Sequence, residues 1–405
     1  MARVCIIGGG TAGEEAAFEA DMRGAHVTIV EKRHAPEPPW RSWPELISGS
    51  PMREGFLNRC RASSPNVLNA EACAAGTGYV ALSGGDRLRF DSVIIATGAR
   101  FEAVTLLGLR RAGVFILDGA EKYVELRRVC ASLDGAVVVG EGYRGLEVFD
   151  RLWSRGVKVR LIISCWQREP PSPLVLEVIE DVARENGAEI QTGDVSRVVG
   201  NGGVEAAVVN GSVVPCDAVV VTPPRAPNPV RAAVKLSQAG AVEVDWGMRT
   251  SAPSLLAAGG CAELKGCAWG SGALNSEPCL SGRVAGSNRV GSGHAIGATR
   301  VEEIRVLGLH WSRIGGRAAR GAFDNQEETV SRRWGSECAC SITHQRLSER
   351  VLRVECIQPS GSSPAGLPPL GADVTLEALA FGLGLSDISP ISDTARLGLR
   401  EWQKS

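Results

Sequence analysis

Short apolar runs, each ended by small residues, recur along the chain and predict buried strands. Two of these runs, Val4–Ile7 and Ala136–Val139, are followed at once by a glycine-rich turn and then by a helical segment. The first helix is expected over the Ala-rich stretch Glu14–Arg23, and the second is expected to end near Gly156. A continuous apolar run is typical of a strand buried on both faces, as in a parallel sheet. The pattern therefore predicts two strand–turn–helix units in one chain.

Further elements can be placed around these two units. Apolar runs predict strands, and longer mixed segments that follow turn residues predict helices. The expected strands are Ala25–Val30, Asp91–Ala96, Val157–Ile163, Asp217–Val221 and Leu255–Ala258, and the expected helices are Leu174–Asn186 and Gly282–Asn288. The Pro- and Trp-rich segment Pro36–Pro51 predicts an irregular loop with a short helix.

The composition changes near Ala298. Beyond this residue the chain has no glycine-rich nucleotide turn, and it contains alternating stretches such as Val351–Cys356 and a Ser-, Pro- and Gly-rich loop at Ser360–Pro369. Alternation of apolar and polar residues is typical of strands with one buried face. We expect an α/β protein whose last part forms a separate α+β domain.

The two glycine-rich turns follow the pattern G-x-G-x-x-G. They read Gly8-Gly9-Gly10-Thr11-Ala12-Gly13 and Gly140-Glu141-Gly142-Tyr143-Arg144-Gly145. In a dinucleotide-binding unit the first glycine makes the tight turn, the second lets the backbone approach the pyrophosphate, and the third lets the helix pack on the strand. The amino terminus of the helix then offers free N–H groups to the phosphates. Two such turns predict two bound dinucleotides, most often a flavin and a nicotinamide.

The residue that follows the second strand of each unit bears on nucleotide choice. Glu31 stands 23 positions after Gly8 and is placed to hydrogen-bond a ribose hydroxyl, whereas the same offset from Gly140 falls on Ile163. Without an acid there, the preference for NADH over NADPH is relaxed. Ser164 and Arg168 follow and either contact a 2′-phosphate or are ordinary solvated loop residues. The choice between NADPH and NADH stays open.

Composition and charge exclude several classes of protein. The chain has 405 residues, 44% hydrophobic and 22% charged, with a net charge of -1, which gives no general attraction to nucleic acid or anionic membranes. No apolar stretch is long enough to predict a membrane span, and no signal-peptide pattern is recognised at the amino terminus. Twelve scattered Cys and five His do not indicate a disulphide framework or a metal site. We expect a cytoplasmic protein.

These motifs, in this order, resemble the pyridine nucleotide-disulphide oxidoreductases, and most closely the branch of coenzyme A-disulphide reductase, NADH oxidase and NADH peroxidase. Gly8–Gly13 with Glu31 resembles the FAD-adenosine motif, Ile94–Gly98 the "ATG" turn, Val137–Glu147 the NAD motif, and Ala257–Glu263 the second FAD motif. The pair Pro227-Asn228 resembles the end of the NAD domain, and Ser389–Asp393 resembles the dimerisation domain.

The resemblance implies an organisation and a set of binding residues. The FAD domain would comprise 1–108 and 230–298, the NAD(P) domain 109–229, and a C-terminal dimerisation domain 299–405, in a homodimer. The implied FAD-binding residues are Gly8, Gly10, Ala12, Gly13, Glu31, Lys32, Thr97, Gly98 and Gly260. The implied NADPH- or NADH-binding residues are Gly140, Gly142, Tyr143, Arg144, Gly145, Glu147, Ser164 and Arg168.

The departures from the family pattern fall on the chemistry. The family's redox-active Cys lies ten positions after the ribose-binding acid, and here Arg41 stands at that position. A guanidinium forms neither a thiolate nor a mixed disulphide, so disulphide and peroxide reduction through that position are not expected. Gly260 replaces an Asp that binds the flavin ribityl chain, Gly384 replaces a Tyr, and Pro224 replaces a Gly near the nicotinamide.

Two features of the sequence, Arg41 and the pair of Cys338 and Cys340, each allow two interpretations. Arg41, between Trp40 and Trp43, either places a fixed positive charge beside the flavin or stacks on a Trp and fills the old substrate channel. Cys338 and Cys340 either form a redox or metal pair or are small apolar residues on one sheet face.

Two hypotheses of function follow. The first is an FAD-dependent NAD(P)H oxidoreductase without a redox Cys, which passes electrons to oxygen, a quinone-like acceptor or a small redox protein. The second is a catalytically inactive binding or regulatory subunit with a flavoprotein fold, because function depends on sites and not on folds.

Overall fold

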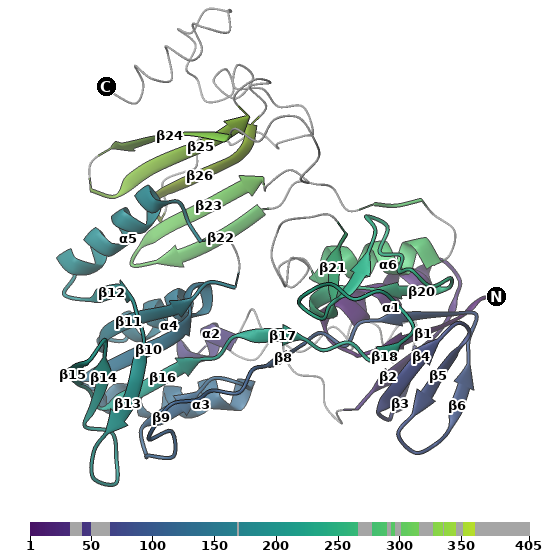
Figure 1. The fold of residues 1–405 in the computed structure, drawn as a ribbon, viewed down its shortest axis with the longest axis horizontal. Helices are drawn as coiled ribbons and strands as arrows, with labels where there is room; N and C mark the ends of the chain where they lie inside the picture. Colours follow the sequence, from purple (N-terminus) through teal and green to yellow (C-terminus); the bar gives the residue numbers. More distant parts are fainter. Residues whose placement is uncertain are drawn as a thin grey trace, which may run out of the picture. The chain divides into compact units, whose positions relative to one another are not determined.

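The structure is a computed structural model that describes residues 1–32, 43–49, 65–167, 170–265, 278–289, 293–295, 301–315, 327–334, 336–345 and 351–360. The chain forms two compact units (Figure 1). Unit 1 comprises Met1–Val104, Leu117–Arg127 and Pro223–Gly297, and unit 2 comprises Thr105–Ile116, Arg128–Thr222 and Ala298–Ser405.

Unit 1 contains a five-stranded sheet in which every neighbouring pair is parallel. The strand order is β20-β7-β1-β2-β3, so the chain crosses between strands that are not consecutive, as in a doubly wound nucleotide-binding sheet. The strands are β1 (Arg3–Ile7), β2 (His26–Glu31), β3 (Asn66–Asn69), β7 (Ser92–Ile95) and β20 (Leu255–Ala257). Helices α1 (Thr11–Met22) and α6 (Pro278–Arg289) pack against each other beside this sheet.

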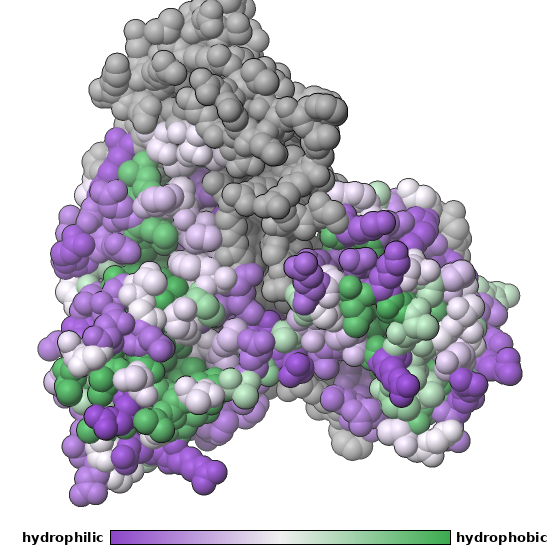
Figure 2. All heavy atoms as spheres, in the orientation of Figure 1, coloured by the Kyte–Doolittle hydropathy of each residue, from purple (hydrophilic) through white to green (hydrophobic). Residues whose placement is uncertain are grey.

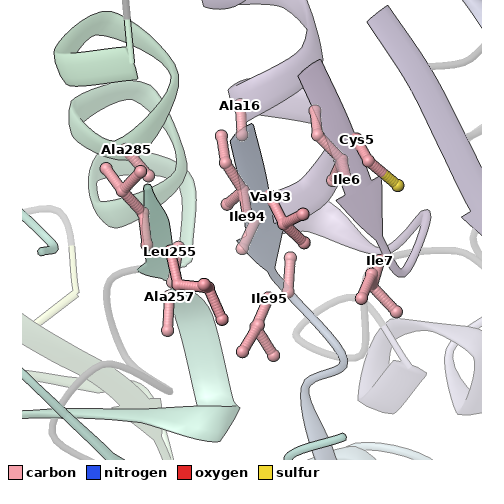
Figure 3. Packing of buried hydrophobic residues seen from close by; sticks show 14 of the residues in the cluster. Cys5, Ile6, Ile7, Ala16, Val93, Ile94, Ile95, Leu255, Ala257 and Ala285 are labelled. Atoms are coloured by element: carbon pink, nitrogen blue, oxygen red, sulfur yellow. The ribbon is translucent and has the colours of Figure 1, made fainter. Parts of the chain in front are cut away.

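The core of unit 1 lies between this sheet and the two helices. Ile6, Ile94 and Ala257, from three neighbouring strands, are fully buried together with Ala16 of α1 and Ala285 of α6 (Figure 3). The alanines have small side chains, so the helices can lie close to the apolar strands. The sequence therefore forms the sheet from continuous apolar runs and covers it with helices of small residues.

Smaller elements complete unit 1. A four-stranded sheet has the order β18-β4-β5-β6, and two short pairs join β8 to β17 and β19 to β21. These strands are β4 (Ala72–Gly76), β5 (Tyr79–Leu82), β6 (Arg87–Arg89), β8 (Ala99–Phe101), β17 (Arg225–Pro227), β18 (Arg231–Ala232), β19 (Val242–Val244) and β21 (Ala262–Leu264). The helical segments are α2 (Trp43–Ile47), η5 (Gly259–Cys261) and most of α3 (Ala120–Val129).

Unit 2 is built on a second parallel sheet with the strand order β12-β11-β10-β16-β9. Its strands are β9 (Val114–Ile116), β10 (Gly135–Glu141), β11 (Lys158–Cys165), β12 (Glu189–Thr192) and β16 (Ala218–Thr222). Helices α4 (Gly142–Trp153) and α5 (Pro173–Glu185) follow β10 and β11, and η4 (Cys130–Ser132) precedes β10. The antiparallel strands β13 (Val195–Val199), β14 (Ala206–Val209) and β15 (Ser212–Pro215) form a separate small sheet.

A five-stranded antiparallel sheet forms the described part of the C-terminal segment. Its order is β22-β23-β26-β25-β24, with β22 (Val301–Val306), β23 (Leu309–Gly315), β24 (Glu327–Trp334), β25 (Cys338–Gln345) and β26 (Val351–Pro359). Helix α4 contacts β22, and α5 contacts β25 and β26. Figure 1 shows α5 lying beside this sheet. The C-terminal sheet is therefore packed onto the second nucleotide unit.

The predicted α/β class and the predicted strands are confirmed, with shifts of one or two residues at most ends. The predicted helix at Gly282–Asn288 begins earlier, at Pro278 of α6. Figure 2 shows hydrophobic residues interspersed among hydrophilic ones on the face it presents. Within the described ranges, no helix has the length and apolar character needed to cross a membrane.

Candidate functional site: two nucleotide turns

The first glycine-rich turn joins β1 to α1 and has the geometry that the motif predicts. Gly8 has φ +104°, and a Cβ there would overlap the carbonyl of Ala96 at the end of β7. A Cβ at Gly13 would overlap the carbonyl of Gly8. The first and third glycines are therefore required by the close approach of backbone to backbone.

The middle of this turn is open. A Cβ added at Gly10 would meet no described atom within 4 Å. Gly10 is the N-cap of α1, and no described side chain caps that helix end. Uncapped N–H groups at a helix amino terminus, beside free space, suit the pyrophosphate of a dinucleotide.

Glu31 lies next to this open turn. Its Oε2 accepts a hydrogen bond from the backbone N–H of Gly9 at 2.6 Å, and Glu31 is the last residue of β2. A carboxylate at this place can accept a hydrogen bond from a ribose hydroxyl. Lys32 beside it is exposed and forms an ion pair with Glu71 at 3.7 Å. The residues present at this turn fit the adenosine and pyrophosphate parts of FAD.

The other predicted FAD segments gather around the start of α1. A Cβ at Gly259 would lie 2.7 Å from the Ala12 Cβ, and one at Gly282 of α6 would overlap the Ala12 carbonyl. The Ser281 hydroxyl accepts from the Gly259 N–H at 3.0 Å and so ties η5 to α6. Gly260 is buried in the same short helical turn and has no side chain to offer a ligand.

A buried thiol lies in the same short helical turn as Gly260 and is not suited to redox chemistry. Cys261 is fully buried and donates to the carbonyl of Ile95 at 3.3 Å. Burial raises the pKa of this thiol, and the nearby Thr97 hydroxyl only partly opposes the effect. A thiol kept protonated is a poor nucleophile. Thr97 is half-buried, and Gly98 after it has φ +70°.

Arg41, the residue predicted at the family's redox position, lies outside the described residues, as does Arg168. The helix that follows Arg41 is described. Trp43 of α2 is buried, and its ring lies 6.1 Å from that of Phe101 and 5.8 Å from that of Tyr123. This aromatic cluster fixes α2 within unit 1.

The second glycine-rich turn joins β10 to α4, and it repeats the contact of the first glycine but not that of the third. Gly140 has φ +137°, and a Cβ there would overlap the carbonyl of Thr222 at the end of β16. A Cβ at Gly145 would lie 2.8 Å from the Cδ1 of Leu161 in β11. This turn is therefore folded as a nucleotide-binding turn.

The middle of the second turn is filled. A Cβ at Gly142 would lie 2.5 Å from ring atoms of Trp166, which follows β11. Glu141 is buried and is the N-cap of α4, and its carboxylate accepts from the N–H groups of Tyr143 at 3.3 Å and Arg144 at 3.0 Å. A tryptophan ring and a carboxylate thus occupy the positions that the motif reserves for a pyrophosphate.

The remaining predicted NAD(P) residues are close in sequence to this turn but differ in exposure. Arg144 is buried, Glu147 is partly buried on α4, and Ser164 of β11 is exposed. Pro224 accepts a hydrogen bond from the Glu102 N–H at 2.9 Å.

A buried polar network behind Tyr143 was not predicted from the sequence. Arg313 of β23 donates to the Tyr143 hydroxyl at 2.9 Å and to the Pro170 carbonyl at 3.0 Å, and it lies 3.5 Å from the Glu355 carboxylate. Glu355 of β26 also accepts from the Ser172 N–H at 2.8 Å. Both charged side chains are almost fully buried, at 4% and 0% exposed. The C-terminal sheet is thereby joined to the nucleotide turn and to the start of α5.

No group of three or more His, Cys, Asp or Glu side chains in the described part of the chain could hold a metal ion. Cys338 is a free thiol that is partly buried in β25, and burial raises its pKa. A cavity of about 920 Å³ lies at the amino ends of β10, β11 and β12, lined among others by Asp134, Lys158 and Glu189. It is at the opposite end of β10 from the nucleotide turn.

The fold and the two turns define a protein with two dinucleotide-binding units of the flavin and nicotinamide type. The pyridine nucleotide-disulphide oxidoreductase family matches residues 2–282, and the chain belongs to this family. Members of the family use FAD and NADH or NADPH, in agreement with the cofactors that the sequence predicts.

Individual relatives are similar to this chain over part of their length. A CoA-dependent NAD(P)H sulfur oxidoreductase of Pyrococcus abyssi is 28% identical over 65% of this chain and 63% of its own. A probable ferredoxin reductase, CtmF, of Castellaniella defragrans is 29% identical over 64% of this chain and 67% of its own. The chain thus spans about two thirds of the length of these relatives. The solved ferredoxin reductase for the CYP199A2 system of Rhodopseudomonas palustris has the same fold, with a TM-score of 0.78 and 18% identity over 95% of this chain and 100% of that one.

Proposed function

We propose that the protein is an FAD-dependent NAD(P)H oxidoreductase that works without a redox-active disulphide. The observation that carries the proposal is the first turn, where no described atom lies within 4 Å of a Cβ at Gly10, no described side chain caps α1, and the Glu31 carboxylate lies at the edge. When bound, the flavin supplies the electron transfer that protein side chains cannot. The residues of the chain bind the flavin, orient it and keep water from it.

The terminal acceptor is proposed to be oxygen, a quinone-like compound or a small redox protein. Arg41 in place of a Cys supports this proposal, because a guanidinium cannot relay electrons as a thiol pair does. The probable ferredoxin reductase among the relatives supports the small redox protein in particular. For Arg41 we propose the two roles given above, a fixed positive charge beside the flavin or stacking on a Trp in the old substrate channel. We also propose a homodimer, a cytoplasmic location and domains at 1–108 with 230–298, 109–229 and 299–405.

The visible spectrum of the purified protein tests this function. We expect a yellow protein whose absorbance is bleached by NADPH or NADH under nitrogen and restored by air or by an added acceptor. A colourless protein that does not take up added FAD would contradict the proposal. An Arg41→Cys variant that gains disulphide reductase activity would support the assignment of position 41.

The second candidate is a binding or regulatory subunit without turnover. The observation that favours it is the filled middle of the second turn, where Trp166 and the Glu141 carboxylate lie. A protein that binds FAD but is not reduced by millimolar NADH or NADPH would support this candidate over the enzyme.

A further inference from the structure

In both nucleotide turns of this chain the first glycine lies against a carbonyl at the end of a neighbouring strand, but the turns differ at the helix amino terminus. At α1 no described side chain caps the helix, and a Cβ at Gly10 would meet no described atom within 4 Å. At α4 the Glu141 carboxylate caps the helix, and a Cβ at Gly142 would lie 2.5 Å from ring atoms of Trp166. The chain therefore contains two turns with the same sequence motif. The helix amino terminus has no described cap in the first turn and is occupied by side chains in the second.

The group that caps α4 is the carboxylate of Glu141, and it lies at a helix amino terminus, where anions bind favourably. The free N–H groups and the dipole at a helix amino terminus attract negative charge, which is why pyrophosphates bind there. The Glu141 carboxylate already accepts from Tyr143 N–H and Arg144 N–H, at 3.3 and 3.0 Å. Glu141 is only 3% exposed, so its hydrogen bonds are shielded from water.

The position of Glu141 in the chain explains why it reaches these amides. It is the first variable residue of the turn and has an extended backbone, with φ -67° and ψ 129°, so its side chain can fold back over the helix end. This is the geometry of an N-cap, in which a side-chain oxygen binds the N–H groups two and three residues later. The equivalent residue of the first turn is Gly9, which has no side chain.

We propose that Glu141 is a built-in competitor for the phosphate position of the second turn, and that NADH or NADPH binds only when this carboxylate moves out. The proposal rests on the proposed function, whose nicotinamide site it concerns. To bind, the pyrophosphate of the nucleotide would have to replace the Glu141 carboxylate at the backbone N–H groups of Tyr143 and Arg144, and this exchange would determine the affinity. Trp166 lies over Gly142, with its ring centroid 5.0 Å from that of Tyr143, so it would also have to move before a pyrophosphate could approach Gly142.

The test compares nucleotide binding to wild type and a Glu141→Ser variant by calorimetry. The probes are NADPH, NADH and ADP-ribose, which carries the pyrophosphate without the nicotinamide, and FAD is present in excess so that the first turn is filled. Serine is a good N-cap but carries no charge, so the helix stays capped while the competing anion is removed. Charge-assisted hydrogen bonds to backbone amides are strong, so we expect the dissociation constants to fall about tenfold or more.

Asp217, which directly precedes β16, offers a matched control. Its carboxylate accepts from Asp134 N–H at 2.8 Å and Gly135 N–H at 3.0 Å, at the opposite end of β10. An Asp217→Ser variant also removes a carboxylate bound to two backbone amides, and we expect its nucleotide affinity to equal that of wild type. Equal or weaker binding by the Glu141→Ser variant, or no detectable binding by any variant, would overturn the proposal.

The same variants separate this inference from the proposed function. If NADPH bleaches the flavin of wild type and of Glu141→Ser at the same concentrations, the inference is wrong and the function stands. If ADP-ribose binds the variant more tightly but neither nicotinamide nucleotide bleaches the flavin, the inference stands and the function is wrong.

Discussion

The Oε2 of Glu141 accepts a hydrogen bond from the backbone N–H of Arg144 at 3.0 Å, which makes Glu141 the cap of α4 as well as the anion in its nucleotide turn. A Glu141→Ala variant loses this cap. We expect the free energy of unfolding to fall by about 1 kcal/mol, whereas Glu141→Ser loses less because serine caps the helix itself. Chemical denaturation measures both. Equal stability of Glu141→Ala and wild type would show that the carboxylate does not cap the helix.

Gly282 allows α6 to lie against the start of α1. A Cβ at this position would overlap the Ala12 carbonyl, so Gly282→Ala must push the two helices apart. We expect a loss of about 1–3 kcal/mol in unfolding free energy, together with weaker FAD binding, because Ala12 belongs to the first turn.

Gly84→Ala is the matched control for this variant, because a Cβ there meets no described atom within 4 Å. Thermal unfolding and a flavin fluorescence titration measure the two effects. A Gly282→Ala protein with wild-type stability and flavin affinity would be incompatible with the observed helix packing.

The buried cysteines are expected to be unreactive at neutral pH. Burial raises the pKa of the Cys5 thiol to about 12, and the pKa of Cys261 is raised for the same reason. Because only the thiolate reacts, these residues should be labelled far more slowly at pH 8 than the exposed Cys73 and Cys279. Peptide mass spectrometry after timed alkylation measures the order of labelling, and early labelling of Cys261 would contradict the raised pKa of this thiol.

The same pKa shift predicts a loss of stability in alkaline solution. The Cys5 pKa is higher in the folded protein, at about 12, than its ordinary value of 9.0. The stability contributed by the protonated thiol is therefore complete below pH 9 and is lost as the pH rises from 9 towards 12. A Cys5→Ala variant should lose less stability than wild type over this interval, as measured by denaturant unfolding. An equal loss in both proteins would assign the effect to other groups.

Arg313 and Glu355 form a buried ion pair, 3.5 Å apart, that joins β23 to β26 beneath Tyr143. Removing one partner leaves the other charge buried, so Arg313→Ala should reduce the unfolding free energy by about 3–5 kcal/mol. The combined Arg313→Met and Glu355→Leu replacement should cost much less. Arg184, exposed in its pair with Asp181, is the control, and Arg184→Ala should cost at most about 1 kcal/mol. Equal losses at Arg313 and Arg184 would refute a structural role for the buried pair.

The sequence predicts the fold well because its strands are buried on both faces. Continuous apolar runs such as Val4–Ile7 are typical of strands buried on both faces of a parallel sheet. Gly8, Gly13 and Gly140 are needed because backbone carbonyls lie close to them, whereas Gly145 lies against the Leu161 side chain. These features depend on neighbours in the chain or on the sheet itself. They could therefore be assigned before the structure was known.

The side chains that occupy the second turn could not be predicted from the sequence in the same way. The role of Gly142 depends on where Trp166 places its ring, and the role of Glu141 depends on a rotamer that folds over the helix end. Arg313 and Glu355 are distant in sequence from Tyr143, and no local pattern marks a residue of an antiparallel strand as part of a nucleotide turn. Such contacts arise only when separate elements pack together.

FAD binding at the first glycine-rich turn can be tested by comparing wild type with a Gly10→Ala variant. A Cβ at Gly10 meets no described atom within 4 Å, and Gly10 has φ -77°, so the variant should fold with wild-type stability. The added methyl group would stand where the pyrophosphate must approach the backbone. If FAD binds at this turn, a fluorescence titration should give about one FAD bound per chain for wild type and strongly weakened binding for Gly10→Ala. Absence of binding to wild type, or equal binding to both proteins, would contradict it.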